Sequence, residues 1–318
     1  MTLMPDQPER KVSGPVTQPN DNRLEVQTRE EGMIMKRVST LVLAAALAAA
    51  LTATAWADED TTITVAASPT PHAEILEEAK PLLAELGYDL EVTVYEDYVL
   101  PNNVVEDGEI DANYFQHIPY LDNFNEENGT HLVNAGGIHY EPFGIYPGTK
   151  SSLDEIEEGD AIAVPNDTTN EARALLLLQD NGIITLKEGA GLTATKLDIE
   201  ENPYNIELVE MEAAQVARVK DEVAFVVLNG NYALQAGFSV AKDSIAYELS
   251  DSEAAKTYVN IIAVREGNED SAKIQALVQV LQSDVIRTYI EETYDGAVVP
   301  FVEPDEEAVT EAATESAD

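Results

Sequence analysis

The fold is decided by residues 62–95, which read TITVAASPTPHAEILEEAKPLLAELGYDLEVTVY. An apolar, β-branched run over 62–67 predicts a strand. Leucine, isoleucine and alanine then recur at helical spacing over 73–86, and a glycine, a typical helix stop, follows. Residues 90–95 alternate in polarity as a second strand would. A strand, a helix and a strand in this order are typical of a layered α/β fold.

The same alternation continues along the chain. Further helices are expected near 102–107, 120–128, 152–157, 170–181, 272–282 and 285–293, and strands near 112–115, 160–164, 206–210, 223–228, 245–249 and 259–264. Residues 131–146 hold strand-like runs that Gly136-Gly137 and Pro142 interrupt. We therefore expect an α/β protein with mixed, mostly parallel sheets flanked by helices. In such sheets ligands bind beyond the carboxyl ends of strands, so residues that follow strands are candidates for a site.

The N-terminal region predicts export. A signal peptide is expected over 35–57, because a Lys-Arg head precedes an uncharged Leu- and Ala-rich stretch that ends in the small-x-small triplet Ala55-Trp56-Ala57. The apolar stretch is short for a membrane span, although an uncleaved anchor is the alternative. Residues 1–34 form an upstream extension that is either disordered or the product of a mis-assigned start codon. We expect an exported chain, extracellular, cell-surface or periplasmic, starting near Asp58.

Charge and composition exclude several classes of function. The first 57 residues carry six basic and six acidic side chains, so the whole net charge of −42 lies on the rest of the chain. Such a surface repels nucleic acid and anionic lipid. The sequence has no cysteine, which excludes disulfides, thiolate metal sites and a thiol nucleophile. Residues 303–318 are acidic without a large apolar face, so we expect a disordered tail.

Aromatic residues gather after two of the predicted strands. Tyr98 follows the second strand, and Phe115, His117 and Tyr120 lie close together around the end of the next one. Ordinary core packing is one explanation. The other is a pocket for an apolar ligand, because aromatic rings make good walls and ring–sulfur contacts are favourable by roughly 0.3–1.5 kcal/mol.

Arg173 is the candidate anchor for an anion. A strand ends at Pro165, residues 166–170 offer several helix caps, and a helix follows. A cation near the start of a helix opposes the helix dipole but suits a bound carboxylate surrounded by free N–H groups. An ion pair with one of the many nearby acids is the alternative.

Two asparagines occupy apolar strand regions. Asn229 follows one strand and Asn260 interrupts another. Burying an unpaired amide costs about 1–3 kcal/mol, so each side chain needs partners. Backbone groups are the ordinary partners. The ammonium or carboxylate of a ligand is the other choice, because an amide both donates and accepts.

The sequence gives little support for catalysis. Its four histidines show no metal-ligand spacing, and neither a GxSxG elbow nor a Walker motif occurs. A hydrolase that uses His117 with a carboxylate, and a purely structural surface protein, remain as alternatives. We expect no catalytic activity, no cofactor and no metal.

Several segments together resemble the methionine-binding MetQ/NlpA lipoprotein family. They are DYVLPN (97–102), GEIDANYFQHIPYLD (108–122), VPNDTTNEARALLLLQ (164–179), ENPYNIELVEMEAAQ (201–215), LNGNYA (228–233) and YVNIIAVRE (258–266). The resemblance spans about 62–302 and keeps the order of the motifs. It implies a two-lobed periplasmic-binding-protein fold of type II-like form, with one lobe over 62–142 plus 258–302 and the other over 143–257. The ligand would lie in the cleft between the lobes, which close on it.

The resemblance also implies roles for individual residues. Tyr98, Phe115, His117 and Tyr120 resemble the pocket for the thioether, and Tyr140 is expected to add to that wall. Arg173 resembles the carboxylate anchor, while Asn229 and Asn260 resemble the groups that hold the two polar ends. The implied ligand is L-methionine, with D-methionine or a related amino acid as variants. Another amino acid or a short peptide in the same fold is the alternative.

The implied partners are the permease and ATPase of an ABC importer, with the binding protein a monomer that does not bind nucleic acid. The sequence departs from the family at one point. The family is usually anchored through a lipid on a cysteine after the signal, and this chain has no cysteine. We therefore expect a protein that is not lipid-anchored by a lipobox cysteine.

Overall fold

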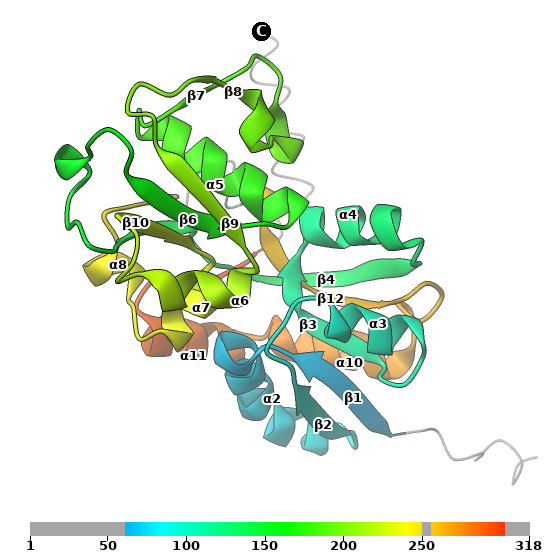
Figure 1. Cartoon of the computed structure of the whole chain (residues 1–318). Helices are drawn as coiled ribbons and strands as arrows, with labels where there is room; N and C mark the ends of the chain where they lie inside the picture. Colours follow the sequence, from blue (N-terminus) through cyan, green and yellow to red (C-terminus); the bar gives the residue numbers. More distant parts are fainter. Residues whose placement is uncertain (1–60, 250–255, 303–318) are drawn as a thin grey trace, which may run out of the picture. The chain divides into compact units, whose positions relative to one another are not determined.

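The computed structural model describes residues 61–249 and 256–302. The predicted extension over 1–34, the signal peptide over 35–57 and the tail over 303–318 lie outside the described residues. The described chain folds into two main sheets and a small sheet in which β7 (Thr185–Leu186) pairs with β8 (Ile199–Glu201). The expected α/β class with mixed sheets flanked by helices is confirmed (Figure 1). Parallel pairing does not predominate as expected, because four strand pairs among the described residues are parallel and six are antiparallel.

The larger sheet has six strands in the order β13-β4-β12-β3-β1-β2. Its strands are β1 (Thr62–Ala67), β2 (Asp89–Val94), β3 (Ala112–His117), β4 (Leu132–Tyr140), β12 (Val259–Arg265) and β13 (Val299–Pro300). Strand β1 runs parallel to both β2 and β3, whereas β12 lies antiparallel between β3 and β4. The segment that follows β11 in sequence thus returns to the sheet begun by the N-terminal strands.

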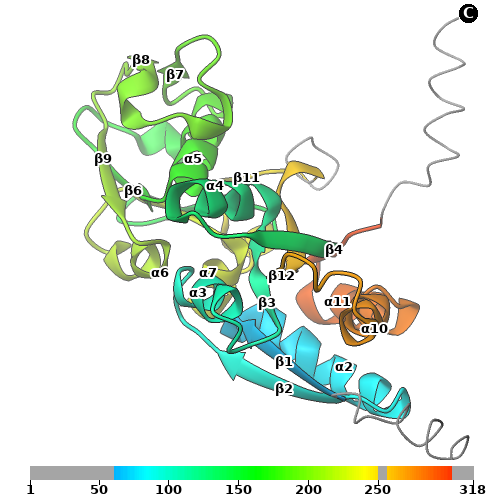
Figure 2. The ribbon, with the colours of Figure 1, turned by 90° about the vertical axis from the view of Figure 1, so that its right-hand side faces the viewer.

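Helices cover both faces of this sheet. On one face lie α2 (Glu74–Glu85), α10 (Ala272–Leu281) and α11 (Asp284–Tyr294), and on the other α3 (Leu100–Glu106) and α4 (Ile118–Asn128) (Figures 1 and 2). Strand β12 shows why helices are needed on both faces of the sheet. Ile262 and Val264 pack toward the first group, while Ile261 and Ala263 pack toward the second. A strand buried on both faces reads as the continuous apolar run seen in the sequence.

The second main sheet has the order β11-β5-β10-β6-β9. Its strands are β5 (Gly144–Pro147), β6 (Ala161–Pro165), β9 (Glu207–Met211), β10 (Phe225–Leu228) and β11 (Ala246–Tyr247). The long helix α5 (Thr168–Asp180) packs on one face. The short helix α6 (Ala213–Val216) and α7 (Gly230–Gln235) pack on the other. Strands β9, β6 and β10 run parallel, so the loops after them leave the same edge of the sheet.

The remaining elements are short. They are the π-helical turn η1 (Pro69–Ala73), the helix α8 (Val240–Asp243) and the 3₁₀ turns η2 (Leu153–Glu155), η3 (Gly191–Thr193), η4 (Lys196–Asp198) and η5 (Ala217–Val219). Over residues 61–249 and 256–302, the structure has no helix with the length and apolar character needed to cross a membrane.

The glycine pair at 136–137 does not break the strand as expected. Strand β4 continues through both residues, with irregular register opposite β12. A Cβ on Gly136 would lie 2.5 Å from Val278 Cγ1 of helix α10, and one on Gly137 would lie 2.9 Å from Phe301. The glycines therefore allow close packing against the strand rather than ending it.

Candidate functional site

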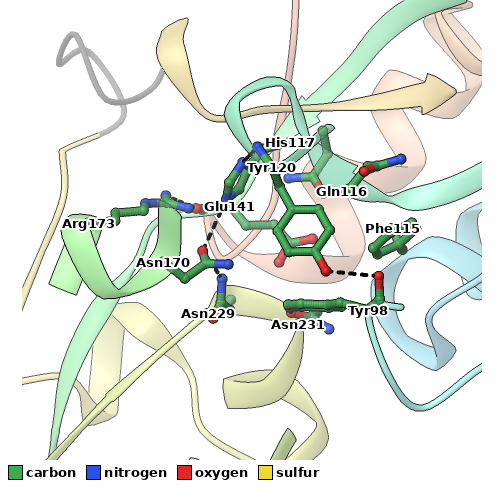
Figure 3. Close-up of a pocket in the computed structure, with 12 residues that line it drawn as sticks. Tyr98, Phe115, Gln116, His117, Tyr120, Glu141, Asn170, Arg173, Asn229 and Asn231 are labelled. Atoms are coloured by element: carbon green, nitrogen blue, oxygen red, sulfur yellow. Dashed lines mark hydrogen bonds between the residues drawn. The ribbon is translucent and has the colours of Figure 1, made fainter. Parts of the chain in front are cut away.

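A pocket lies where the carboxyl ends of β3, β4 and β10 meet the start of α5. Its walls come from the surroundings of both main sheets. The lining residues are Tyr98, Phe115, Gln116, His117, Tyr120, Glu141, Asn170, Arg173, Asn229, Gly230, Asn231 and Asn260. Seven of the eight predicted site residues are in this set. Figure 3 shows Arg173 at one end of the pocket and Phe115 with Tyr98 at the other.

Three aromatic rings form one end of the pocket. The ring centroid of Tyr98 lies 5.6 Å from that of Phe115 and 5.7 Å from that of Tyr120. The Tyr120 hydroxyl donates to the Tyr98 carbonyl at 3.0 Å, and the Tyr98 hydroxyl donates to Asn231 Oδ1 at 2.5 Å. The polar atoms of both tyrosines are thus engaged by the protein, which leaves ring surface for a ligand.

His117 lies between the aromatic end and the polar end. Its Nδ1 accepts the backbone N–H of Tyr120 at 3.1 Å, so the proton is on Nε2, which donates to Asn170 Oδ1 at 3.0 Å. Burial and, to a smaller extent, the charge of Arg173 lower the pKa of His117 to about 3. The ring is therefore neutral. The hydrolase alternative requires a carboxylate paired with His117, and neither ring nitrogen bonds to one.

Arg173 lies in the second turn of α5, because the helix begins at Thr168 with the Asp167 side chain as its N-cap. The side chain is only 4% exposed. Its Nε donates to Glu248 Oε1 at 2.8 Å and its Nη2 to Glu248 Oε2 at 2.5 Å. The ion pair that the sequence left open as an alternative is therefore present, and the guanidinium lines the pocket as well.

The hydrogen bonds of Arg173 to Glu248 and Glu141 use two of its three side-chain nitrogens. Besides the pair with Glu248, Nη2 donates to the Glu141 carbonyl at 3.0 Å, and Nη1 takes part in none of these bonds. The guanidinium carbon lies 4.0 Å from the ring centroid of Tyr258. Burial opposes the charge, but the ion pair with Glu248 outweighs burial and raises the pKa of Arg173. A second carboxylate could still bind at Nη1.

Tyr140 is the predicted site residue that the structure does not bring to the pocket. Its hydroxyl donates to Glu248 Oε2 at 2.7 Å, and its ring lies 5.9 Å from the guanidinium carbon of Arg173. Tyr140 is buried and is not among the residues that line the pocket, so it does not join the aromatic wall as expected. Its contacts support the arginine instead.

The two predicted asparagines both line the pocket with different partners. Asn229 Nδ2 donates to Asn170 Oδ1 at 2.8 Å, while its Oδ1 is buried with no partner among the described residues. Asn260 Oδ1 lies 3.0 Å from His72 Nε2. Backbone groups, the ordinary partners considered above, form neither of these bonds, because both partners are side chains.

Five lining residues were missed by the sequence reasoning: Gln116, Glu141, Asn170, Gly230 and Asn231. Asn170 was considered only as a helix cap. Asn231 stands two residues after Asn229 in the same motif, so its position after a strand was a usable signal. A Cβ on Gly230 would lie 2.7 Å from Glu141 Oε2, so glycine is required there for Glu141 to approach.

This arrangement can be compared with known proteins. A sequence model described as NlpA lipoprotein matches residues 63–302, from β1 to the last described residue. The chain belongs to the NlpA lipoprotein family. Among curated NlpA-family relatives, the methionine-binding lipoprotein MetQ of Bacillus subtilis is 45% identical over 267 residues, which cover 83% of this chain and 96% of the relative.

Solved structures of similar proteins agree with the fold. A putative lipoprotein from Ruminococcus gnavus is 78% identical with a TM-score of 0.76, and the match covers 76% of this chain and 100% of that one. A nutrient binding protein from Burkholderia cenocepacia bound to methionine is 39% identical with a TM-score of 0.72, again over 76% and 100%. Family membership confirms a binding protein rather than an enzyme.

The family corrects the expected localisation. We expected a protein without a lipid anchor because the sequence has no cysteine. The matching family is one of lipoproteins, and the Bacillus subtilis relative is named a lipoprotein, so that expectation is wrong. The expectation rested on one residue type. The absence of cysteine concerns only attachment through a thiol and does not determine how a protein is held at a membrane.

Proposed function

We propose that this chain is the substrate-binding protein of an ABC importer and that its ligand is methionine. The observation that carries the proposal is one buried pocket with an arginine at one end and a cluster of aromatic rings at the other. The names of the Bacillus subtilis relative and of the Burkholderia cenocepacia complex support the choice of ligand.

The polar end of the pocket suits both charged groups of an amino acid. Arg173 Nη1 is the donor for a carboxylate at this end. The buried Asn231 Nδ2, which has no partner among the described residues, is a second unmet donor and lies nearer the rings, because the Asn231 side chain accepts from Tyr98. The Glu141 carboxylate and the unpartnered Asn229 Oδ1 are acceptors for an ammonium. Unmet donors and unmet acceptors in one pocket favour a zwitterion, because a buried polar group without a partner costs about 1–3 kcal/mol.

The aromatic end suits the thioether. Tyr98, Phe115 and Tyr120 offer ring surface, and a sulfur near a ring edge gains roughly 0.3–1.5 kcal/mol over a purely aliphatic chain. Removal of the side chain from water adds roughly 25 cal/mol per Å² of apolar area. The aromatic end thus supplies affinity, and the polar end supplies orientation.

The expected division into lobes explains how binding would be signalled. With one lobe over 62–142 plus 258–302 and the other over 143–257, the aromatic rings come from the first and Arg173 with Asn229 from the second. The Tyr98–Asn231 and His117–Asn170 hydrogen bonds then join the lobes beside the ligand. A ligand that contacts both lobes favours the closed state, which the permease and ATPase would recognise.

Calorimetric titration of the chain from Asp58 onward with a panel of amino acids and short peptides tests the proposal. We expect saturable binding of L-methionine at one site per chain and much weaker binding of alanine, glutamate and lysine. Preferential binding of a peptide would move the assignment to the short-peptide alternative. No binding of methionine at millimolar concentration would contradict the proposed function.

A further inference from the structure

Two histidines lie directly behind the polar end of the pocket and do not line it. His72 belongs to η1 and His139 to β4, and both are essentially fully buried. His139 Nε2 lies 2.8 Å from Glu141 Oε1, and His72 Nε2 lies 3.4 Å from the same oxygen. The ligand-facing carboxylate therefore rests against two imidazole rings, and nothing in the proposed function uses these rings.

The partners of His139 determine which of its nitrogens carries the proton. When Glu141 is ionised, as pairing with the ammonium of the proposed ligand requires, its carboxylate can only accept, so Nε2 donates to Glu141. Nδ1 is then a bare lone pair, and the Tyr114 hydroxyl donates to it. Burial lowers the pKa of His139 to about 3, which keeps the ring neutral with one proton. Tyr114, His139 and Glu141 thus form a chain of hydrogen bonds that all run toward the pocket.

The same reasoning fixes the Asn260 side chain. His72 Nε2 faces both the Glu141 carboxylate and one end of the Asn260 amide, at 3.0 Å. Because the carboxylate accepts, Nε2 is a donor, and the amide atom that faces it must be the oxygen Oδ1. The Asn260 Nδ2 group is then left for the pocket. His72 Nδ1 has no partner among residues 61–249 and 256–302, which is consistent with a bare lone pair.

We propose that His72 and His139 are positioning residues that decide which end of an amino-acid ligand each polar group receives. His139 and His72 hold Glu141 as an ionised acceptor for the ammonium. His72 also turns the Asn260 amide so that Nδ2 donates to the carboxylate. The ligand class is therefore an amino acid with both α-groups free. This inference rests on the amino-acid binding proposed above and adds the residues that orient the ligand.

A metal ion is the competing explanation for the cluster. His72, His139 and Glu141 each place one ligand atom within 4.8 Å of the others, and two histidines with a glutamate form a known zinc set. A metal would need a bare lone pair on both Nε2 atoms. The proton would then move to His72 Nδ1, where no described residue accepts it. The hydrogen-bonded arrangement leaves only a lone pair unmatched, so it is favoured.

The test compares three probes: L-methionine, 4-(methylthio)butanoic acid, which lacks the ammonium, and 3-(methylthio)propylamine, which lacks the carboxylate. In His139→Phe the Glu141 carboxylate loses a donor. We expect binding of methionine and of the amine to weaken by about tenfold or more, and binding of the acid to stay unchanged or improve. His139→Gln keeps an amide N–H near the Nε2 position and should recover most of the affinity.

His72 provides a second arm with a different signature. Because His72 contacts both Glu141 and Asn260, His72→Phe should weaken binding of all three probes, and His72→Gln should restore it. The exposed His131 gives the control variant His131→Gln, which should bind like the wild type. The ratio of two dissociation constants does not depend on how much of the protein is folded, so a destabilised variant remains informative.

The dependence of methionine affinity on pH distinguishes a role of the histidines in orienting the ligand from a general role in supporting the pocket. Besides the two histidines, Arg173 and the backbone N–H of Asn231 face Glu141, and Tyr98 and Tyr114 lie nearby. In His139→Phe the Glu141 carboxylate loses a hydrogen-bond donor, which raises its pKa. As the pH is lowered, methionine affinity should therefore begin to fall at a higher pH than in the wild type, because a protonated Glu141 cannot pair with an ammonium.

Three outcomes would overturn the inference: equal weakening of all probes in His139→Phe, an unchanged pH profile, or stoichiometric zinc that methionine binding requires. If the wild type binds no methionine at all, the proposed function fails rather than the role of the histidines.

Discussion

Arg173 takes part in two carboxylate interactions if a ligand binds, one with Glu248 and one with the ligand. The planar guanidinium can serve both because Nε and Nη2 face Glu248 while Nη1 is left over. A lysine has one charged nitrogen and cannot hold both carboxylates in this geometry. Arg173→Lys should therefore weaken methionine binding by roughly 30-fold or more.

The matched control for that variant is Arg218→Lys. Arg218 is exposed and lies outside the pocket, so titration should give the wild-type affinity. Equal affinity in the wild type and Arg173→Lys would show that the guanidinium does not hold the ligand.

Phe115 tests the contribution of the sulfur. It is 3% exposed and contacts the rings of Tyr98 and Tyr120. We expect the wild type to prefer methionine over norleucine by about two- to tenfold, the size of a ring–sulfur contact. In Phe115→Leu the preference should shrink toward one, with norleucine affinity changed little. A full preference in that variant, measured by calorimetry, would locate sulfur recognition elsewhere.

Single residues also show where sequence reasoning stops. The aromatic residues and Arg173 were predictable because their types are rare in this acidic chain and they follow strands. Glu141 was not, since one acid among sixty carries no signal by itself. Tyr140 and Glu141 are neighbours, and adjacent side chains at a strand end point to opposite sides. Which side faces the pocket depends on the pairing of β4 with β12 and β13, which is not a local property.

The N-cap of helix α5 both stabilises the helix and positions a residue of the pocket. Asp167 Oδ1 accepts the backbone N–H of Asn170 at 3.0 Å and its side-chain amide at 2.8 Å, so the cap also fixes a pocket residue. Asp167→Ala should lower the free energy of unfolding by about 1 kcal/mol, as loss of an N-cap does, and should also weaken methionine binding severalfold.

Ser283 gives the matched control, because it caps α11 far from the pocket residues in sequence and lines no part of the pocket. Ser283→Ala should reduce stability similarly in urea unfolding and leave the affinity unchanged. A pure stability effect in Asp167→Ala would mean that Asn170 does not depend on its cap.

Elements were predicted better than their ends. The strand over 62–67 and the helices near 272–282 and 285–293 agree with β1, α10 and α11, because amphipathic periodicity reports the buried face. The strand expected over 245–249 is reduced to Ala246–Tyr247 in β11, an edge strand paired only with β5. The glycines inside β4 led to the wrong expectation of a break in the strand. Glycine is needed there because Val278, a residue distant in sequence, approaches the strand closely.

At the scale of the whole molecule, three buried histidines make stability depend on pH. Burial lowers the pKa of His72 to about 4 and of His117 and His139 to about 3, against an ordinary value of 6.5. Below pH 6.5 the unfolded chain takes up protons that the native chain does not. Stability is thus fully present above pH 6.5 and is lost as the pH falls toward 4, by at most about 1.4 kcal/mol per histidine per pH unit.

Burial raises the pKa values of Glu141 and Asp167, and that of Glu171 to about 7. These carboxyls act in the opposite sense, so the net slope is smaller than the three histidines alone would give. Urea unfolding at pH 7, 6 and 5 should show a steady loss of stability in the wild type. His117→Gln should show a shallower loss, while His131→Gln should follow the wild type because His131 is exposed. Parallel curves for all three proteins would mean that His117 is not held neutral by burial.

The central claim concerns direction: the carboxylate of methionine at Arg173 and its side chain among the rings. A crystal structure of the chain with selenomethionine tests it most directly, because anomalous scattering locates the selenium without reference to the rest of the map. We expect selenium in contact with Phe115, Tyr98 and Tyr120, and a carboxylate oxygen within hydrogen-bond distance of Arg173 Nη1. Selenium beside Arg173, or a ligand outside this pocket, would contradict it.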